Sequence, residues 1–444
     1  MIIRGGKVAI PGHDEPVRMD IRVEQGKIAG IGVSLDGDGG IINAGGLLVI
    51  PGGIDPHVHF DEPGYTSRED FFHGSSFAAS GGITTVIDMP CTSVPPVTNL
   101  ENLQNKLDVI SQRSVVDYGL FGGVSRQSFD EGFPGNMREL APMVLGFKTY
   151  FISGMESFGR LDHYRFEKVL EAAHKLGLPV LLHAEDFDYV DAATEFNRDR
   201  NDAFAYYLSR PESAEILAVE AAVALAKRAD ADLHIVHLGT AQAAESVGEG
   251  RITGETAPHY LAFDTEDFER IGSALKVTPP VKSTGNADRL WQMLADGKIA
   301  FVASDHASCL REEKSTGSIW SDYSGIPGTG TLLPYLFSEG YLAGRLSLSR
   351  FVEVVSSAAA RRYGIFDRKG SIEVGKDADL ALIDESASLT VRGDEFLSKG
   401  KITPFEGTTF RGKVVRTIIR GKTVFDEKHG VIAEPGFGEF LKRH

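Results

Sequence analysis

Short apolar runs recur along the middle of the chain, and most are followed by a longer segment with the spacing of an amphipathic helix. The runs are rich in Val, Ile, Leu and Phe, as are strands buried on both faces. They cover residues 47–59, 83–88, 117–122, 146–151, 179–184, 232–238, 252–257 and 299–304. The helical segments cover residues 69–80, 99–112, 164–176, 214–228, 241–248 and 287–295. Eight strands that alternate with helices predict an α/β fold, a (β/α)8 barrel of the TIM type.

The two ends of the chain have a different pattern. At 444 residues the chain is longer than the about 250 residues of a bare barrel. Both ends carry short β-runs separated by turn signals such as Gly-Lys and Lys-Asp. We therefore expect residues 1–50 and 371–444 to form one small composite β-sandwich domain, and residues 51–370 to form the catalytic barrel. Residues 414–424 resemble residues 1–10, which suggests that these two segments pair with each other.

Composition excludes several classes of protein. The formal net charge is −16, and no cluster of Lys and Arg offers a surface for nucleic acid. The two cysteines, Cys91 and Cys309, make no disulfide framework. The amino terminus has no basic and apolar leader, and no apolar run reaches about 18 residues. We expect a cytoplasmic protein that contacts neither membrane nor nucleic acid.

Six polar residues lie at or near the downstream ends of the predicted strands, where parallel barrels gather their chemistry. Alternation along a strand places His57 and His59 on the same side. A single histidine at a strand end is more often a hydrogen-bonded core residue, but so many together carry a desolvation cost unless something binds them. The set predicts a two-metal hydrolytic centre: His57, His59, Lys148, His183, His237 and Asp305.

Lys148 differs from the other five because it lies inside an apolar run, GFKTYF. Burial lowers the pKa of a lysine, and a neutral amine can add carbon dioxide to form a carbamate. The resulting carboxylate on a long stem suits a bridge between two divalent cations. The alternative is an ordinary lysine that is paired with Asp305 or another acid, and spacing alone does not decide between them.

Several motifs in order make the chain resemble the cyclic amidohydrolases of the amidohydrolase superfamily, which include dihydroorotases, allantoinases and hydantoinases. They are PGGIDPHVHFDEPG at 51–64, GGITTVIDMP at 81–90, GFK at 146–148, LHAE at 182–185, IVHL at 235–238, ASDH at 303–306 and GSIEVGKDADL at 370–380. The resemblance implies that His57 and His59 hold one metal with Asp305, that His183 and His237 hold the other, and that carboxylated Lys148 bridges them.

The same resemblance implies a mechanism. Two divalent ions, zinc or else manganese, iron or cobalt, would activate a shared hydroxide that attacks a ring amide. Asp305 would act as the catalytic base and then deliver its proton to the departing nitrogen.

The range of possible substrates is narrowed because this chain lacks residues that dihydroorotases use to bind their substrate. Dihydroorotases hold a substrate carboxylate with an Arg, an Asn and a His at positions where this chain has Asp61, Cys91 and Cys309. The resemblance is nearer to allantoinases, through the stretches DMPCTSVPP at 88–96, TAPHYLAFD at 256–264, KVTPP at 276–280, SDHASC at 304–309, and GSIW at 317–320 through GIPG at 325–328. It implies hydrolysis of allantoin to allantoate.

Dihydroorotase and hydantoinase or dihydropyrimidinase activity remain as alternatives. Asp61 and Arg68 depart from the allantoinase pattern, which usually has Asn or Ser and then Trp at these positions. Asp61, Ser153 and Thr278 are candidate contacts to the substrate.

A non-catalytic scaffold is a further alternative, because some relatives of hydantoinases have lost their metal ligands. All six ligand positions are filled in this chain, which disfavours that reading. The family usually forms homodimers or homotetramers, so the resemblance also implies a symmetric homo-oligomer.

Overall fold

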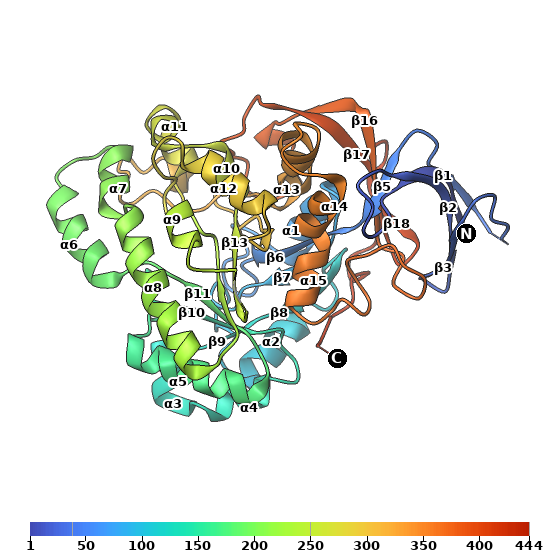
Figure 1. Cartoon of the computed structure of the whole chain (residues 1–444). Helices are drawn as coiled ribbons and strands as arrows, with labels where there is room; N and C mark the ends of the chain where they lie inside the picture. Colours follow the sequence, from blue (N-terminus) through green and yellow to red (C-terminus); the bar gives the residue numbers. More distant parts are fainter. Residues whose placement is uncertain (38, 249, 444) are drawn as a thin grey trace.

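The centre of the molecule is a ring of parallel strands surrounded by helices (Figure 1). The computed structural model describes residues 1–37, 39–248 and 250–443. Hydrogen bonds join the ring into two sheets, with the orders β14-β13-β12-β11-β10-β9 and β15-β6-β7-β8. The chain closes the ring, because β8 leads into β9 and β14 leads into β15. This arrangement confirms the predicted TIM-type barrel.

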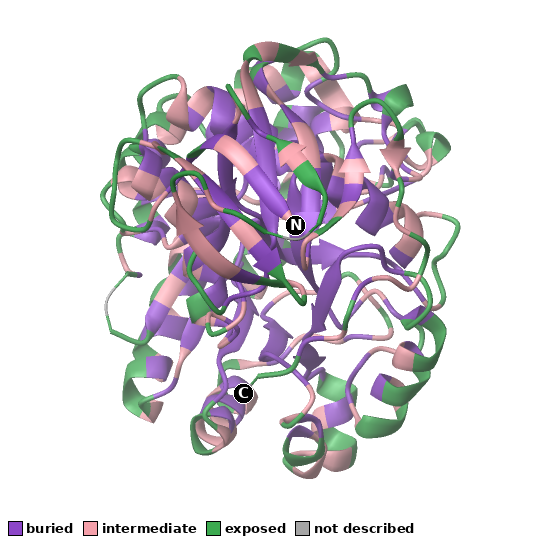
Figure 2. Ribbon diagram, turned by 90° about the vertical axis from the view of Figure 1, so that its right-hand side faces the viewer, coloured by how far each residue is buried: buried purple, intermediate pink, exposed green. Residues whose placement is uncertain are grey.

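The strands of the barrel lie within the predicted apolar runs. Their bounds are β6 (Gly53–His59), β7 (Ile83–Asp88), β8 (Asp117–Leu120), β9 (Gly122–Gly123), β10 (Phe147–Tyr150), β11 (Val180–His183), β12 (Leu233–Ile235), β13 (Ile252–Thr256), β14 (Phe301–Val302) and β15 (His306–Ala307). Almost every residue in them is buried, and Figure 2 shows exposed residues mainly on the outer helices and loops. The strand interiors therefore form the core that fixes the positions of the strand ends.

The six predicted helices are present, although α9 is shorter than expected. The α-helices are α1 (Phe71–Ser80), α2 (Leu100–Ile110), α3 (Arg126–Gly132), α4 (Gly135–Leu140), α5 (His163–Leu176), α6 (Phe187–Asn197), α7 (Ala203–Ser209), α8 (Glu212–Ala229), α9 (Ala241–Ala244), α10 (Pro258–Ala262), α11 (Thr265–Ile271), α12 (Asn286–Ala295), α13 (Thr329–Tyr335), α14 (Leu348–Val352) and α15 (Ala358–Arg362). Shorter turns are the 3-10 helices η1 (Gly272–Leu275), η2 (Arg311–Lys314) and η5 (Gly393–Glu395) and the π-helices η3 (Leu336–Tyr341) and η4 (Glu353–Ser357). Side-chain caps explain several helix starts: the carboxylate of Asp162, for example, accepts from the backbone N–H of Arg165 where α5 begins.

Strands from both ends of the chain form one nine-stranded sheet, and Figure 1 shows them together as blue and red arrows. Its main path is β19-β18-β17-β16-β5-β1-β2-β3, and β4 also pairs with β1. The bounds are β1 (Ile2–Val8), β2 (Val17–Glu24), β3 (Lys27–Gly32), β4 (Ile41–Asn43), β5 (Leu48–Pro51), β16 (Leu380–Thr390), β17 (Thr409–Ile419), β18 (Lys422–Asp426) and β19 (Gly430–Val431).

One expectation for these terminal strands is wrong. Residues 1–10 do not pair with residues 414–424, because β5 and β16 lie between β1 and β17 in the sheet. Similar side chains in the two segments reflect similar burial in one sheet, which does not require direct pairing. The proposed domain boundaries at residues 50 and 371 remain a prediction.

A buried charge cluster connects the barrel to this sheet. Lys369 Nζ lies 2.5 Å from Asp117 Oδ2 on β8, 3.0 Å from Asp377 Oδ2 and 2.6 Å from Asp379 Oδ2. All four side chains are buried, and Arg420 also contacts Asp117. The lysine thus occupies the position that a cation would take among three acids, and the cluster has a structural explanation.

In the described part of the chain, no helix has both the length and the apolar character required to cross a membrane.

Candidate metal centre

His57, His59 and Asp305 meet at the mouth of the barrel. His57 and His59 are two residues apart on β6, and both rings turn their Nε2 atoms toward Asp305 Oδ1, at 3.2 and 3.4 Å. Asp305 follows β14 with a φ of 50°, in the left-handed region. A residue other than glycine rarely adopts that conformation, and it occurs preferentially at functional sites. The predicted alternation therefore brings these three donors together around one point.

A second pair of imidazoles lies beside the first. His183 ends β11 and His237 follows β12, and their ring centroids are 4.6 Å apart. The ring of His237 lies 5.5 Å from that of His57. His183 Nε2 lies 2.8 Å from Glu185 Oε2, so its other ring nitrogen stays available. In the part of the chain that the structure describes, the buried Nδ1 atom of His237 has no hydrogen-bond partner, although buried polar atoms usually have one.

Lys148, on β10, is fully buried, and its Nζ atom has no hydrogen-bond partner among the described residues. No carboxylate in that part of the chain lies within ion-pair distance of it, so the alternative of an ordinary lysine paired with Asp305 finds no support. Burial lowers the pKa of Lys148 to about 8, despite the opposing influence of Cys91 and Asp305. A buried amine without a hydrogen-bond acceptor is costly, and carboxylation of Lys148 would remove that cost.

The electrostatics of the histidines fit a cation. Burial lowers the pKa values of His57 and His237 well below the ordinary value, which favours the neutral rings that bind metals. His59 behaves differently: although burial lowers its pKa, Cys91 and Asp305 raise it to about 10. A proton on His59 would supply the positive charge next to Asp305 that a metal ion would otherwise supply.

Glu255, on β13, contacts the metal-ligand candidate His57 on the ring nitrogen that faces away from Asp305. Its Oε1 atom accepts from His57 Nδ1 at 2.6 Å, and its Oε2 atom lies 3.2 Å from His234 Nε2. A carboxylate on the far ring nitrogen orients the imidazole and makes it a better ligand. Glu255 was not predicted from the sequence as a site residue. The available signal was a charged residue inside the apolar run 252–257, where an unpaired carboxylate would be costly.

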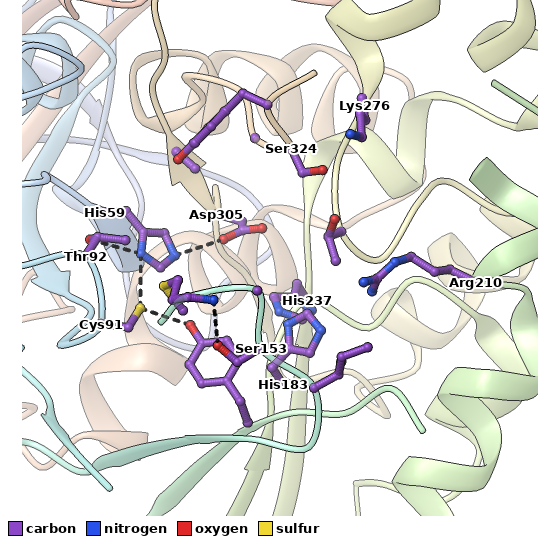
Figure 3. Close-up of a pocket in the computed structure, with 18 of the residues that line it drawn as sticks. His59, Cys91, Thr92, Ser153, His183, Arg210, His237, Lys276, Asp305 and Ser324 are labelled. Atoms are coloured by element: carbon purple, nitrogen blue, oxygen red, sulfur yellow. Dashed lines mark hydrogen bonds and ion pairs between the residues drawn. The ribbon is translucent and has the colours of Figure 1, made fainter. Parts of the chain in front are cut away.

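The centre opens into a cavity of about 480 Å³. Figure 3 shows His59, Cys91 and Thr92 on one side of it, Arg210 and Lys276 on the other, and Asp305 between them. Tyr150 also lines the cavity, and its hydroxyl lies 3.0 Å from Cys91 Sγ. Tyr150, Arg210 and Lys276 could not be singled out from the sequence, because none of them belongs to a recognisable metal-binding motif, although Tyr150 ends β10.

The three candidate substrate contacts have different positions. Ser153 and Thr278 line the cavity, whereas Asp61 is not among its lining residues. Asp61 is buried, and neither of its carboxylate oxygens has a hydrogen-bond partner within residues 1–37, 39–248 and 250–443. Burial raises its pKa to about 7. Ser153 and Thr278 therefore have the access that a substrate contact needs.

A parallel barrel with histidines, a lysine and an aspartate clustered at its strand ends defines a class, the metal-dependent barrel hydrolases. Comparison with known proteins agrees with this class. Residues 48–424 match the amidohydrolase family, and the chain belongs to that family.

Curated relatives of similar length cover essentially the whole chain. An allantoinase of Rubrobacter xylanophilus is 39% identical over 100% of this chain and 97% of its own. An allantoinase of Solibacter usitatus is 36% identical over 99% of this chain and 96% of its own.

Solved structures agree. The L-hydantoinase (dihydropyrimidinase) of Arthrobacter aurescens superposes with a TM-score of 0.93 at 34% identity, covering 100% of this chain and 99% of its own. The dihydropyrimidinase of Brevibacillus agri has a TM-score of 0.91 at 30% identity, with 100% and 98% coverage.

Proposed function

We propose that this protein is a metal-dependent hydrolase that opens the ring of allantoin to give allantoate. The observation that carries the proposal is the buried, unpartnered amine of Lys148 at a barrel mouth that also gathers four histidines and Asp305. Allantoinases that align over essentially the whole chain support the choice of substrate.

The donor set would hold two divalent ions. His57, His59 and Asp305 would take one ion, and His183 and His237 would take the other. Lys148, carboxylated by carbon dioxide, would serve as the bridging ligand. Imidazole and carboxylate donors suit zinc. Two bound ions would supply Lewis-acid chemistry: they would lower the pKa of water and polarise an amide carbonyl.

The remaining chemistry belongs to side chains of the protein. Burial tends to raise the pKa of Asp305, but the hydrogen bond from His59 and the nearby His237 lower it to about 2, so the carboxylate is ionised at neutral pH. We propose that Asp305 Oδ2 accepts a proton from the attacking water and passes it to the amide nitrogen that leaves as the ring opens. Ser153 and Thr278 would contact the substrate from the cavity wall. Asp61 is buried and does not line the cavity, so it would influence the substrate without direct contact.

Hydantoinase or dihydropyrimidinase activity is the second candidate, because the two solved structures described above carry those names. Dihydroorotase activity is less well supported. Asp61 occupies the position where dihydroorotases have a carboxylate-binding Arg, so this chain lacks that contact to an anionic ring.

A substrate panel tests the proposal. Metal-loaded protein is assayed with allantoin, hydantoin, dihydrouracil and dihydroorotate, and kcat/KM is compared. We expect allantoin to be the best substrate. A preference for dihydrouracil or hydantoin would favour the second candidate, and preferred turnover of dihydroorotate would refute the choice of allantoin. Protein with less than one metal ion per chain and no ring-opening activity after metal addition would support the scaffold alternative.

We also propose a cytoplasmic homodimer or homotetramer. Exposed aromatic residues on two neighbouring helices support self-association: Phe196 on α6 is 88% exposed and Phe204 on α7 is 36% exposed. Sedimentation of the purified protein distinguishes a dimer or tetramer from a monomer.

A further inference from the structure

Lys276 brings a positive charge to the wall of the cavity. The residue is buried, and its side chain lines the cavity opposite Cys91 and Thr92 (Figure 3). Its Nζ atom donates to the backbone carbonyls of Trp320 and Asp322. An ammonium group has three N–H donors, so these two neutral acceptors leave one donor without a hydrogen-bond partner among the described residues.

No described carboxylate forms an ion pair with Lys276. The nearby carboxylate of Asp322 is occupied elsewhere, because it accepts from the Oγ1 atom of Thr316 at 2.7 Å and from the hydroxyl of Ser273. Burial lowers the pKa of Lys276 to about 8, which leaves the amine mostly protonated at pH 7. A buried cation without a counter-charge is costly, and such groups occur preferentially at functional sites.

The surroundings of Lys276 suit a neutral group that carries a carbonyl. Its Nζ atom lies 4.7 Å from the centre of the Tyr206 ring, and the Tyr206 hydroxyl bonds Thr278 Oγ1 at 2.6 Å. The neighbouring cation, Arg210, is already paired with Glu185 at 2.6 Å. Two acidic residues, Asp305 and Asp322, line the same cavity, and their negative charges disfavour an anionic substituent on the ligand.

We propose that Lys276 determines specificity by donating a hydrogen bond to the carbonyl oxygen of a neutral ureido substituent on the substrate ring. Asp305 marks the part of the cavity where the ring is opened, and Lys276 lines another part of the same cavity (Figure 3). In the proposed binding mode, a ring that reacts near Asp305 extends its substituent across this cavity toward the free donor of Lys276. This inference rests on the proposed function, because allantoin carries a ureido group and hydantoin does not.

The test compares Lys276→Met with Lys314→Met in the metal-loaded enzyme. Lys314 is also buried, and its Nζ atom donates to the backbone carbonyl of Lys276 at 2.9 Å, but it does not line the cavity. We expect Lys276→Met to lower kcat/KM for allantoin by about 10- to 100-fold, mainly through KM, because a charged hydrogen bond to the substituent is lost. Its kcat/KM for hydantoin should stay within about threefold. Lys314→Met should leave the ratio of allantoin to hydantoin turnover unchanged.

Equal losses on allantoin and hydantoin in Lys276→Met would overturn the inference, since a structural role lowers both. A wild-type preference for hydantoin-5-acetate over allantoin would also overturn it, because the wall would then select an anion. If Lys276→Met does not fold, Lys276→Ala, which also lacks a side-chain donor, carries the test, and an unchanged ratio in that variant rejects the inference. Wild-type enzyme that opens hydantoin but not allantoin would instead refute the proposed function, which is a separate result.

Discussion

Glu255 Oε1 lies 2.6 Å from His57 Nδ1, and both side chains are buried at the base of the candidate metal centre. Glu255 thus holds the imidazole ring of His57 through Nδ1, while the opposite nitrogen, Nε2, faces Asp305. It therefore fixes both the orientation of the imidazole and the nitrogen that carries the proton.

We expect Glu255→Gln to weaken metal binding by about 10- to 100-fold, because an amide orients and polarises the imidazole less strongly than a carboxylate. Competition with a chromogenic chelator measures the affinity. Glu215→Gln is the matched control, since Glu215 is also buried but bonds the backbone N–H groups of Gly239 and Thr240. Equal metal affinity in wild type and Glu255→Gln would contradict the supporting role.

Lys148→Ala should abolish ring opening and lower the metal content, because the bridging carboxylate is lost. Added acetate or propionate should restore part of the activity by filling the space with a free carboxylate. Activity and bound metal are measured as the acid concentration rises.

Lys106→Ala is the control for this rescue. Lys106 is an equally buried lysine, but it is paired with Asp88 at 2.7 Å. Short acids should not restore what that variant loses. Full activity of Lys148→Ala without added acid would remove Lys148 from the mechanism.

Lys369→Met should destabilise the fold by about 3 to 5 kcal/mol, because three buried carboxylates lose their central cation. Urea denaturation followed by circular dichroism measures the change. Lys413→Met is the comparison: Lys413 pairs with Glu427 at 3.1 Å, with both side chains about one third exposed. An exposed pair contributes at most about 1 kcal/mol. Similar losses of unfolding free energy in the two variants would show that the buried cluster contributes no more to stability than an exposed ion pair.

The stability of the fold should depend on pH through Glu215. Burial raises its pKa from 4.5 to about 7, against the lowering influence of Lys282. The folded state then holds this proton more firmly than the unfolded state, so the contribution to stability is present below pH 4.5 and is lost as the pH rises through 7.

Glu215→Gln removes this dependence. Between pH 5 and pH 8 the variant should lose less stability than wild type, by on the order of 2 kcal/mol. Urea denaturation at the two pH values supplies the comparison. Parallel curves for the two proteins would mean that Glu215 is ionised throughout.

The barrel could be predicted because each buried strand is a continuous apolar run. The run at 83–88 matches β7 at both ends, and the runs at 146–151 and 179–184 extend past β10 and β11 by one residue at each end. The run at 299–304 was too long, since only Phe301–Val302 is a strand. The chain turns sharply at Asp305, and a left-handed residue leaves no mark in an apolar pattern.

Two helices beside the site, α6 and α7, were not predicted. The segment that contains them is polar, and the linker between them reads Arg198-Asp199-Arg200-Asn201, which is typical of a loop. Their helical form depends on caps and packing, such as the Asp202 carboxylate that accepts from Ala205 N. Tertiary contacts of this kind are invisible to a pattern of hydrophobic positions.

The site was predictable where residue type and strand position coincide, as at His57, His59 and Asp305. It was not predictable where a side chain reaches in from another element. Lys276 lies after the turn η1, and its role depends on carbonyl groups of residues 320 and 322, far along the chain. Sequence spacing carries no information about such a meeting point.

The nine-stranded sheet has a consequence for biosynthesis. The strand β5 pairs with β1 on one edge and with β16 on the other, and Lys7 bonds Glu385 across 378 positions. The early strands therefore leave the ribosome long before their partners have been translated. This sheet cannot be completed during most of synthesis, and the edge of β5 that pairs with β16 stays unpaired until the last part of the polypeptide has been made.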